Sequence, residues 1–165
     1  MRKVLILLVL VSSPLLADSA RRIEREVIVS APRAEVWNAW ASVDGVKTFF
    51  APDAKIELAP GGAYEILFDM SQPPGLRGGE GNRVIAFEQP RMLLFSWNAP
   101  PKFGALRDER TYVLLQFDDA SGGGTRVRLT HFGWRNSAEW KPVFEYFETA
   151  WTYVMNSFSK RYTAR

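Results

Sequence analysis

The chain has no cysteine and a single histidine, His131, among its 165 residues. The absence of cysteine excludes disulfides, thiolate nucleophiles and sulfur ligands for a metal. One histidine without clustered carboxylates does not make a closed metal site, which takes about four ligands. We therefore expect no metal and no other cofactor. The sequence also lacks a Ser-His-Asp order, a phosphate-binding glycine loop and suggestively spaced carboxylate pairs, so no catalytic residue is assigned.

Long apolar runs and basic clusters are missing too. The apolar run at residues 4–11 is about eight residues long, whereas a helix needs roughly 20 to span a bilayer. We expect no stable membrane span once this run is removed. The chain has 21 basic and 18 acidic side chains, without a Lys/Arg cluster long enough to follow a phosphate backbone. Nucleic acid is therefore not an expected partner.

The N-terminus has the order of a secretory signal. Arg2 and Lys3 precede the apolar run, and Pro14 and the small residue Ala17 follow it. This order predicts a signal peptide over residues 1–17, cleaved after Ala17 or as late as residue 19. A disordered or core-packed N-terminus is the alternative. The signal predicts a periplasmic or secreted protein, and the loss of Arg2 and Lys3 leaves a net charge of +1.

What the chain has in quantity is apolar and aromatic side chains, at 47% and 13% of its residues. This content and length predict one folded domain over residues 21–165. Near its end, Phe144, Phe147, Trp151, Val154 and Phe158 recur at steps of three or four. The spacing predicts an amphipathic helix over residues 142–161, about 30 Å long. Such a helix has to lie across one face of a sheet to bury its apolar side.

Alternating apolar and polar residues bounded by Gly and Pro predict antiparallel strands ahead of that helix. Val127, Leu129 and His131 are expected to face inward. Asn136 and Glu139 have capping-box spacing, and the proline at 142 is expected to restart or kink the helix. The predicted fold class is α+β, a curved antiparallel sheet wrapped around a long C-terminal helix. Strands are expected over residues 22–29, 54–58, 63–70, 83–88, 92–97, 110–117 and 125–132, and a short helix over residues 32–41.

The order and spacing of several short segments resemble the START-like (SRPBCC) superfamily, and within it the branch of homologues of the activator of heat-shock-protein ATPase. The resemblance spans about residues 23–162 and implies a helix-grip fold. Superfamily members include lipid and hormone carriers, cyclases and co-chaperones. Two features depart from the branch: the apparent export signal, and Phe49-Phe50 where relatives often place Trp-Phe. The segments are Ala31-Pro32 with Glu35-Val36-Trp37, Pro60-Gly61-Gly62, Pro90-Arg91 with Leu93 and Trp97, and Thr125 through Thr130-His131 to Gly133-Trp134.

A curved sheet against a helix is hard to fill with side chains, so we expect a cavity with apolar walls and a few polar groups. Leu76 and Phe103 are candidate gates, on the loops at residues 71–79 and 98–108, which are long for hairpin connections. These loops form either the cavity mouth or loosely ordered surface. The expected lining residues are Tyr64, Phe68, Phe87, Phe95, Trp97, His131, Trp134, Phe147 and Trp151.

The sequence allows two interpretations of His131. It is either a polar hook or general base inside the cavity, or, as we favour, a buried histidine hydrogen-bonded to backbone or to a tyrosine. Tyr112 and Arg110 are further candidate hooks, although the alternation of its strand turns Tyr112 toward solvent. The charged run at residues 107–110 is typical of solvated charge at the start of a strand.

The leading hypothesis is an exported protein that binds a small hydrophobic molecule without covalent chemistry. One alternative is a cyclase- or hydrolase-type enzyme that uses His131 as its acid–base group in the same cavity. The other is a co-chaperone-like module that docks a protein partner on the exposed face of the sheet. An export signal argues against the co-chaperone role, because cytosolic chaperones would then be out of reach.

Overall fold

The structure, a computed structural model, describes residues 21–163. The predicted signal peptide lies outside these residues, so its existence and cleavage stay predictions. The described elements, in chain order, are β1 (Ile23–Val29), α1 (Arg33–Ala41), α2 (Val43–Val46), β2 (Asp53–Ile56), β3 (Tyr64–Leu67), β4 (Val84–Glu88), β5 (Met92–Trp97), the 3₁₀ helix η1 (Pro101–Asp108), β6 (Thr111–Asp119), the 3₁₀ turn η2 (Ser121–Gly123), β7 (Thr125–Phe132) and α3 (Trp140–Lys160).

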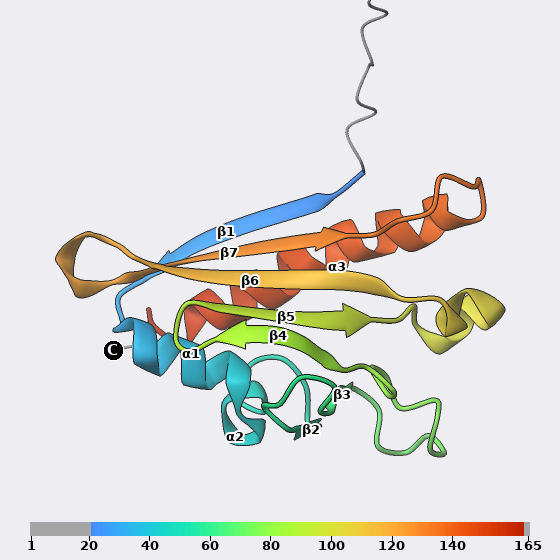
Figure 1. The fold of residues 1–165 in the computed structure, drawn as a ribbon, viewed down its shortest axis with the longest axis horizontal. Helices are drawn as coiled ribbons and strands as arrows, with labels where there is room; N and C mark the ends of the chain where they lie inside the picture. The colour runs from blue at the N-terminus through green and yellow to red at the C-terminus, as the bar shows by residue number, and fades with distance from the viewer. Residues whose placement is uncertain (1–20, 164–165) are drawn as a thin grey trace, which may run out of the picture.

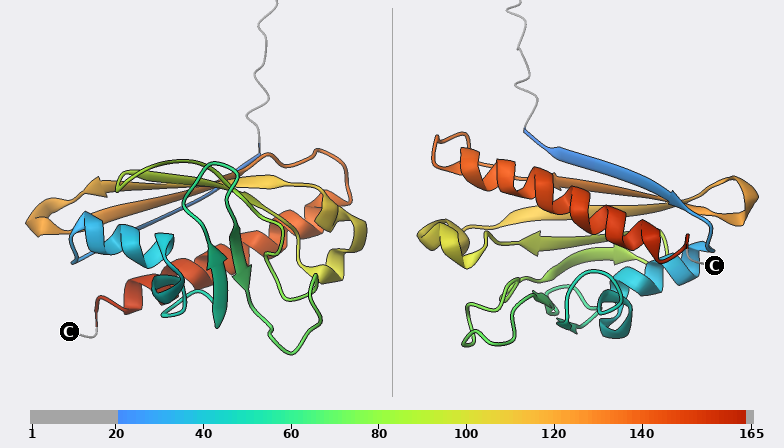
Figure 2. Two further views of the ribbon diagram at one scale, coloured as in Figure 1. Left: turned by 60° about the horizontal axis from the view of Figure 1, so that its bottom comes forward. Right: turned by 180° about the vertical axis from the view of Figure 1, so that it is seen from behind.

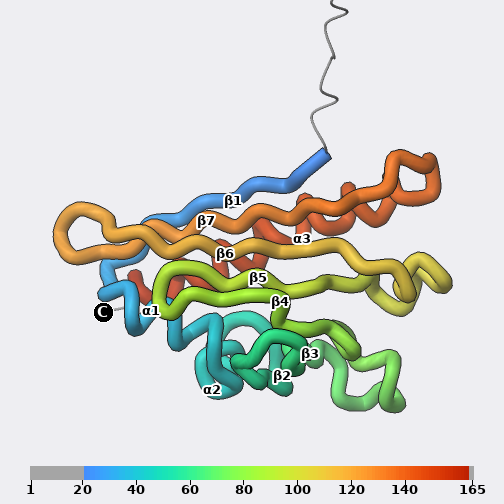
Figure 3. Tube along the Cα trace, in the orientation of Figure 1, coloured from blue at the N-terminus to red at the C-terminus, as the bar shows by residue number. Residues whose placement is uncertain are grey.

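Five of the strands form one antiparallel sheet in the order β1-β7-β6-β5-β4 (Figure 1). The predicted strand positions are confirmed to within a few residues, but β2 and β3 pair with each other in a separate two-stranded sheet. The bridge between Ala63 and Arg83 links this small sheet to the start of β4. Figure 3 shows α2, β2, β3 and the loop that follows them gathered beside β4.

The two faces of the main sheet follow the alternation in the sequence. In β7, Val127, Leu129 and His131 are buried, while Arg126 and Arg128 are exposed. The buried residues pair with buried residues of β6, as His131 does with Val113. The sequence prediction for this hairpin is therefore confirmed, and the inward face is the one that α3 covers.

The helix α3 runs across that face of the sheet (Figure 2), as its apolar stripe requires. Phe147, Trp151, Val154 and Phe158 are buried, and Phe144 is half-buried. The curved sheet with its C-terminal helix confirms the predicted α+β class.

The start of α3 differs from the prediction. The helix begins at Trp140 after Glu139, whose side chain makes no capping hydrogen bond. The capping box at Asn136 and Glu139 was therefore wrong. Pro142 falls in the first turn of a continuous helix, where its missing N–H would have no partner in any case.

The other end of the concave face is closed by α1. The ring of Trp37 lies 5.6 Å from that of Phe117 and 6.5 Å from that of Phe87. The Tyr64 hydroxyl donates to the carbonyl of Trp40 over 2.8 Å. These contacts fill the space between α1 and the sheet with side chains.

Candidate ligand-binding pocket

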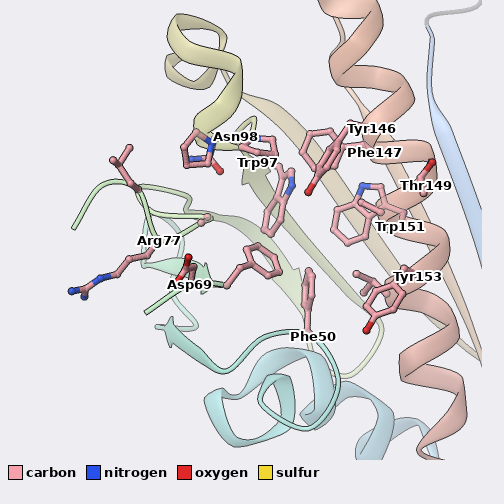
Figure 4. A pocket seen from close by; sticks show the side chains of 18 of the residues that line it. Phe50, Asp69, Arg77, Trp97, Asn98, Tyr146, Phe147, Thr149, Trp151 and Tyr153 are labelled. Atoms are coloured by element: carbon pink, nitrogen blue, oxygen red, sulfur yellow. The ribbon is translucent and has the colours of Figure 1, made fainter. Parts of the chain in front are cut away.

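A pocket of about 860 Å³ lies between the end of β5, the loop after β3 and the middle of α3 (Figure 4). Aromatic rings make most of its walls, and polar side chains occur mainly where the loop contributes. The lining residues are Phe50, Phe68, Asp69, Gln72, Leu76, Arg77, Gly78, Gly79, Trp97, Asn98, Pro100, Pro101, Tyr146, Phe147, Thr149, Ala150, Trp151, Tyr153 and Val154.

Four rings from different elements form one connected group in the wall of the pocket. Phe50 follows α2 and stacks on Trp97 of β5 at 5.9 Å between ring centres, with 19° between the ring planes. Trp151 of α3 lies 5.5 Å from Trp97 and 5.8 Å from Phe50. Phe68, just after β3, closes the group with an edge contact to Phe50 at 5.7 Å. Aromatic rings packed at these separations stabilise one another beyond their burial, so the walls hold their shape.

A buried hydrogen-bond chain connects two of these walls. The Trp151 indole donates to Nδ1 of His131 over 2.8 Å. An indole only donates, so Nδ1 is the acceptor and the ring proton sits on Nε2. The Nε2–H donates to the Thr111 hydroxyl over 2.7 Å, and that hydroxyl donates to the carbonyl of Trp97 over 3.2 Å.

This chain leaves His131 without a free ring nitrogen. The side chain is buried, and burial holds its pKa well below the usual value, because the charged form would lose its hydration. The histidine therefore stays neutral and orients Trp151. Its partners are Thr111 and Trp151 rather than the backbone or a tyrosine.

One side of the pocket mouth is held by Arg107 of η1. Its guanidinium donates to the carbonyls of Ala99 over 2.8 Å and Gly78 over 2.6 Å. It also pairs with the Glu80 carboxylate at 3.4 Å. That carboxylate accepts the backbone N–H of Arg77 over 2.7 Å. The run at residues 107–110 is thus partly buried, and Arg107 joins the two loops that the sequence proposed as the mouth.

The other side of the mouth connects η1 to α3. The ammonium of Lys102 lies 4.3 Å from the ring centre of Tyr146, and the Phe103 ring lies 5.8 Å from it. Burial raises the pKa of the Tyr146 phenol. Tyr146 therefore forms part of the rim, between a cation and the pocket.

The family model of activator of Hsp90 ATPase homolog 1-like proteins matches residues 30–162 of the chain. The chain belongs to this family. Membership confirms the resemblance found in the sequence, and it covers the domain that contains the pocket.

Solved structures share the fold at low sequence identity. Protein MLL2253 from Mesorhizobium loti has a TM-score of 0.68 and 18% identity, over 85% of this chain and 95% of that one. The Aha1 dimer from Colwellia psychrerythraea has a TM-score of 0.63 and 17% identity, over 87% and 97%. PFC0360w, an HSP90 activator from Plasmodium falciparum, has a TM-score of 0.61 and 14% identity, over 82% and 91%. None of the curated proteins compared with the chain matches it.

Some of the aromatic residues that the sequence predicted as cavity lining do line the pocket. Phe68, Trp97, Phe147 and Trp151 line it, as does the predicted gate residue Leu76. Phe103 does not line the pocket; it is partly buried, and its ring packs against that of Tyr146.

The other predicted residues do not line the pocket but lie in the core or pack against it: Tyr64, Phe87, Phe95, His131 and Trp134. Tyr64 of β3 stacks on Phe95 at 4.1 Å, and Phe87 packs on Trp37 of α1. Trp134 lies 4.2 Å from His131, and its indole donates to the His131 carbonyl.

The two further candidate polar groups, Tyr112 and Arg110, do not line the pocket either. Tyr112 is on the opposite face of the sheet, where it is 37% exposed, as its alternation predicted. Arg110 donates to the Arg107 carbonyl over 2.6 Å.

Several lining residues were missed. Phe50 had a signal, since Phe49-Phe50 was noted as a departure from the family pattern. Tyr146, Ala150 and Tyr153 follow one another at steps of four and three, which places them beside the stripe of Phe147 and Trp151. Asp69 had no signal, because nothing in the sequence shows that the loop after β3 folds back toward α3.

Two other kinds of site were sought in residues 21–163. These residues contain no group of three His, Asp or Glu side chains placed to bind a metal ion. No helix among them has both the length and the apolar content to cross a membrane.

Proposed function

We propose that the domain binds a small hydrophobic molecule non-covalently in the pocket between β5, the loop after β3 and α3. The observation that supports this most strongly is the pocket itself, about 860 Å³ in volume and walled by Phe50, Phe68, Trp97 and Trp151. Pockets for small molecules are about 300–1,000 Å³, mainly apolar, with a few polar groups. This pocket has both properties.

Exposed apolar side chains at the rim support the same proposal. Phe68 is 45%, Leu76 46% and Tyr153 72% exposed, and all three line the pocket. Large exposed apolar groups that gather around a cavity are typical of a binding site. A ligand that covers these side chains would remove their apolar surface from water.

The surroundings of His131 favour binding over catalysis. An acid–base role requires the imidazole to reach a bound molecule. His131 instead uses both ring nitrogens for Thr111 and Trp151 and is buried behind the pocket wall.

The sheet face opposite α3 mixes exposed Tyr112 with the ion pair of Arg128 and Asp118. This mixture of apolar and charged groups favours the pocket over this face as the binding surface.

Native mass spectrometry of the protein purified from its own host tests the proposal. We expect a bound mass of a few hundred daltons, in the size range that such pockets take. Organic extraction should release it as a hydrophobic compound. A native mass equal to that of the polypeptide alone, with no extractable compound, would count against the proposal.

We also propose that the mature protein acts outside the cytoplasm. The basic pair Arg2 and Lys3, the apolar run at residues 4–11 and Ala17 support this. Intact-mass analysis of the host's periplasmic and medium fractions should find a chain that begins at Asp18 or shortly after. Full-length protein confined to the cytosolic fraction would contradict it.

A further inference from the structure

We infer that Trp97 is the hydrogen-bond donor of the pocket, and that the ligand is an uncharged, largely apolar molecule with a hydrogen-bond acceptor such as a carbonyl oxygen. This inference rests on the proposed function and specifies its ligand class. It depends on one unpaired polar atom, on its position and on the charges around it.

The indole Nε1 of Trp97 is buried and has no hydrogen-bond partner among the described residues. Trp97 as a whole is only 3% exposed. Buried N–H groups in native proteins almost always have a partner, because an unpaired one loses its bond to water without replacement. Nε1 is enclosed by its neighbours even in the empty pocket, so a ligand acceptor can bond to it only when the ring turns slightly toward the pocket. A ligand bound in this way is the group that can supply the missing partner.

The position of Trp97 supports this assignment. Trp97 lines the pocket from β5, and Figure 4 shows its ring nitrogen on the side that faces α3. The other pocket tryptophan, Trp151, already donates its N–H to His131. The Nε1 of Trp40 is also unpaired, but Trp40 does not line the pocket. A bound molecule can therefore satisfy Trp97 but not Trp40.

The charges around the pocket favour an uncharged acceptor over a carboxylate. Figure 4 shows the guanidinium of Arg77 directed away from the aromatic walls. Asp69 lines the pocket, and hydrogen bonds from Ser71 hold the pKa of its carboxyl below the usual value.

The two other cations of the rim already have partners: Lys102 lies on the Tyr146 ring, and Arg107 is bonded to Glu80 and to backbone carbonyls. A carboxylate at Trp97 would thus meet a like charge at the mouth without a free cation among the described residues of the rim to pair with it.

The test compares two probes of the same polycyclic body, methylpyrene and pyrene carboxaldehyde, of which only the second has a carbonyl. Wild type, Trp97→Phe and Tyr146→Phe are titrated with each probe by fluorescence, after circular dichroism has shown that they fold. Tyr146 lines the pocket from α3, so its variant controls for the loss of a polar group on the other wall. The carbonyl stretching frequency of the aldehyde bound to wild type is measured as well.

We expect Trp97→Phe to weaken aldehyde binding about tenfold, the usual scale for one hydrogen bond to a buried acceptor. Methylpyrene binding should change less than about twofold. Tyr146→Phe should affect both probes alike, and the bound carbonyl should absorb at lower frequency than in hexane.

Equal losses for the two probes, a selective loss in Tyr146→Phe instead, or a hexane-like carbonyl frequency would overturn the inference while leaving the proposed function intact. Failure of wild type to bind either probe would overturn both. Should Trp97→Phe fail to fold, the carbonyl frequency in wild type decides the matter by itself.

Discussion

Trp151 and His131 are joined by a hydrogen bond of 2.8 Å in which the indole donates to Nδ1 of the only histidine in the chain. The bond fixes the tautomer of His131 and the orientation of Trp151, which is a wall of the pocket. The histidine therefore acts on the pocket through Trp151. It does not act by contact with a ligand.

The stability of the fold should depend on pH through His131. Its pKa is lowered in the folded state, so below the unfolded value of about 6.5 the unfolded chain binds a proton that the folded chain does not. The free energy of unfolding should be unaffected by this group above about pH 7. It should fall by up to about 1.4 kcal/mol per pH unit as the pH drops below about 6.5.

Urea unfolding between about pH 8 and about pH 5 measures this dependence. The variant His131→Gln should show a much flatter profile across the same range, because it removes the only histidine. Parallel profiles for wild type and the variant would show that burial of His131 does not control the acid side of stability.

Removal of the imidazole should also destabilise the fold at neutral pH. His131→Ala breaks the bonds to Thr111 and Trp151 and leaves a cavity, which together should cost about 3–5 kcal/mol. Arg128→Ala, on the exposed face of the same strand, removes only a surface ion pair and should cost less than about 1 kcal/mol. Similar urea midpoints for the two variants would be inconsistent with this account.

The pocket mouth should loosen when Arg107 is removed. Arg107→Ala deletes the donors that hold the carbonyls of Ala99 and Gly78, so hydrogen exchange at residues 75–79 should become at least about tenfold faster. Arg135→Ala removes an exposed ion pair with Glu109 and should leave these amides unchanged. Unchanged exchange in Arg107→Ala would mean that other contacts hold the loop.

The fold was predictable from local pattern because its strands and long helix bury one side each. Alternation in β7 placed His131 on the inward face, and the steps between Phe147, Trp151, Val154 and Phe158 located α3. The local pattern did not predict that β2 and β3 pair in a separate sheet, because the alternation within a strand does not show which strands it pairs with.

The pocket was only partly predictable, because alternation gives the face of a sheet but not the position along it. Phe95 and Trp97 share one face of β5, yet Phe95 stacks under Tyr64 while Trp97 reaches the pocket. The difference arises from where Tyr64 of β3 packs, which is a tertiary contact. The hydrogen bond from Arg107 to the carbonyl of Gly78 could not be predicted either, because a charged run such as residues 107–110 is typical of an exposed surface.

The central claim is that the space between α3 and the sheet receives a ligand, and Ala150 offers the most direct test. Ala150 is half-buried on α3 and lines the pocket, so the ring of Ala150→Phe should project into the pocket and obstruct it with little change in stability. Asn156→Phe adds the same ring at an exposed position of α3 outside the pocket. Fluorescence titration with methylpyrene should show binding to wild type and Asn156→Phe, and at least about tenfold weaker binding to Ala150→Phe. Equal affinity for all three proteins, or none for any of them, would contradict the claim.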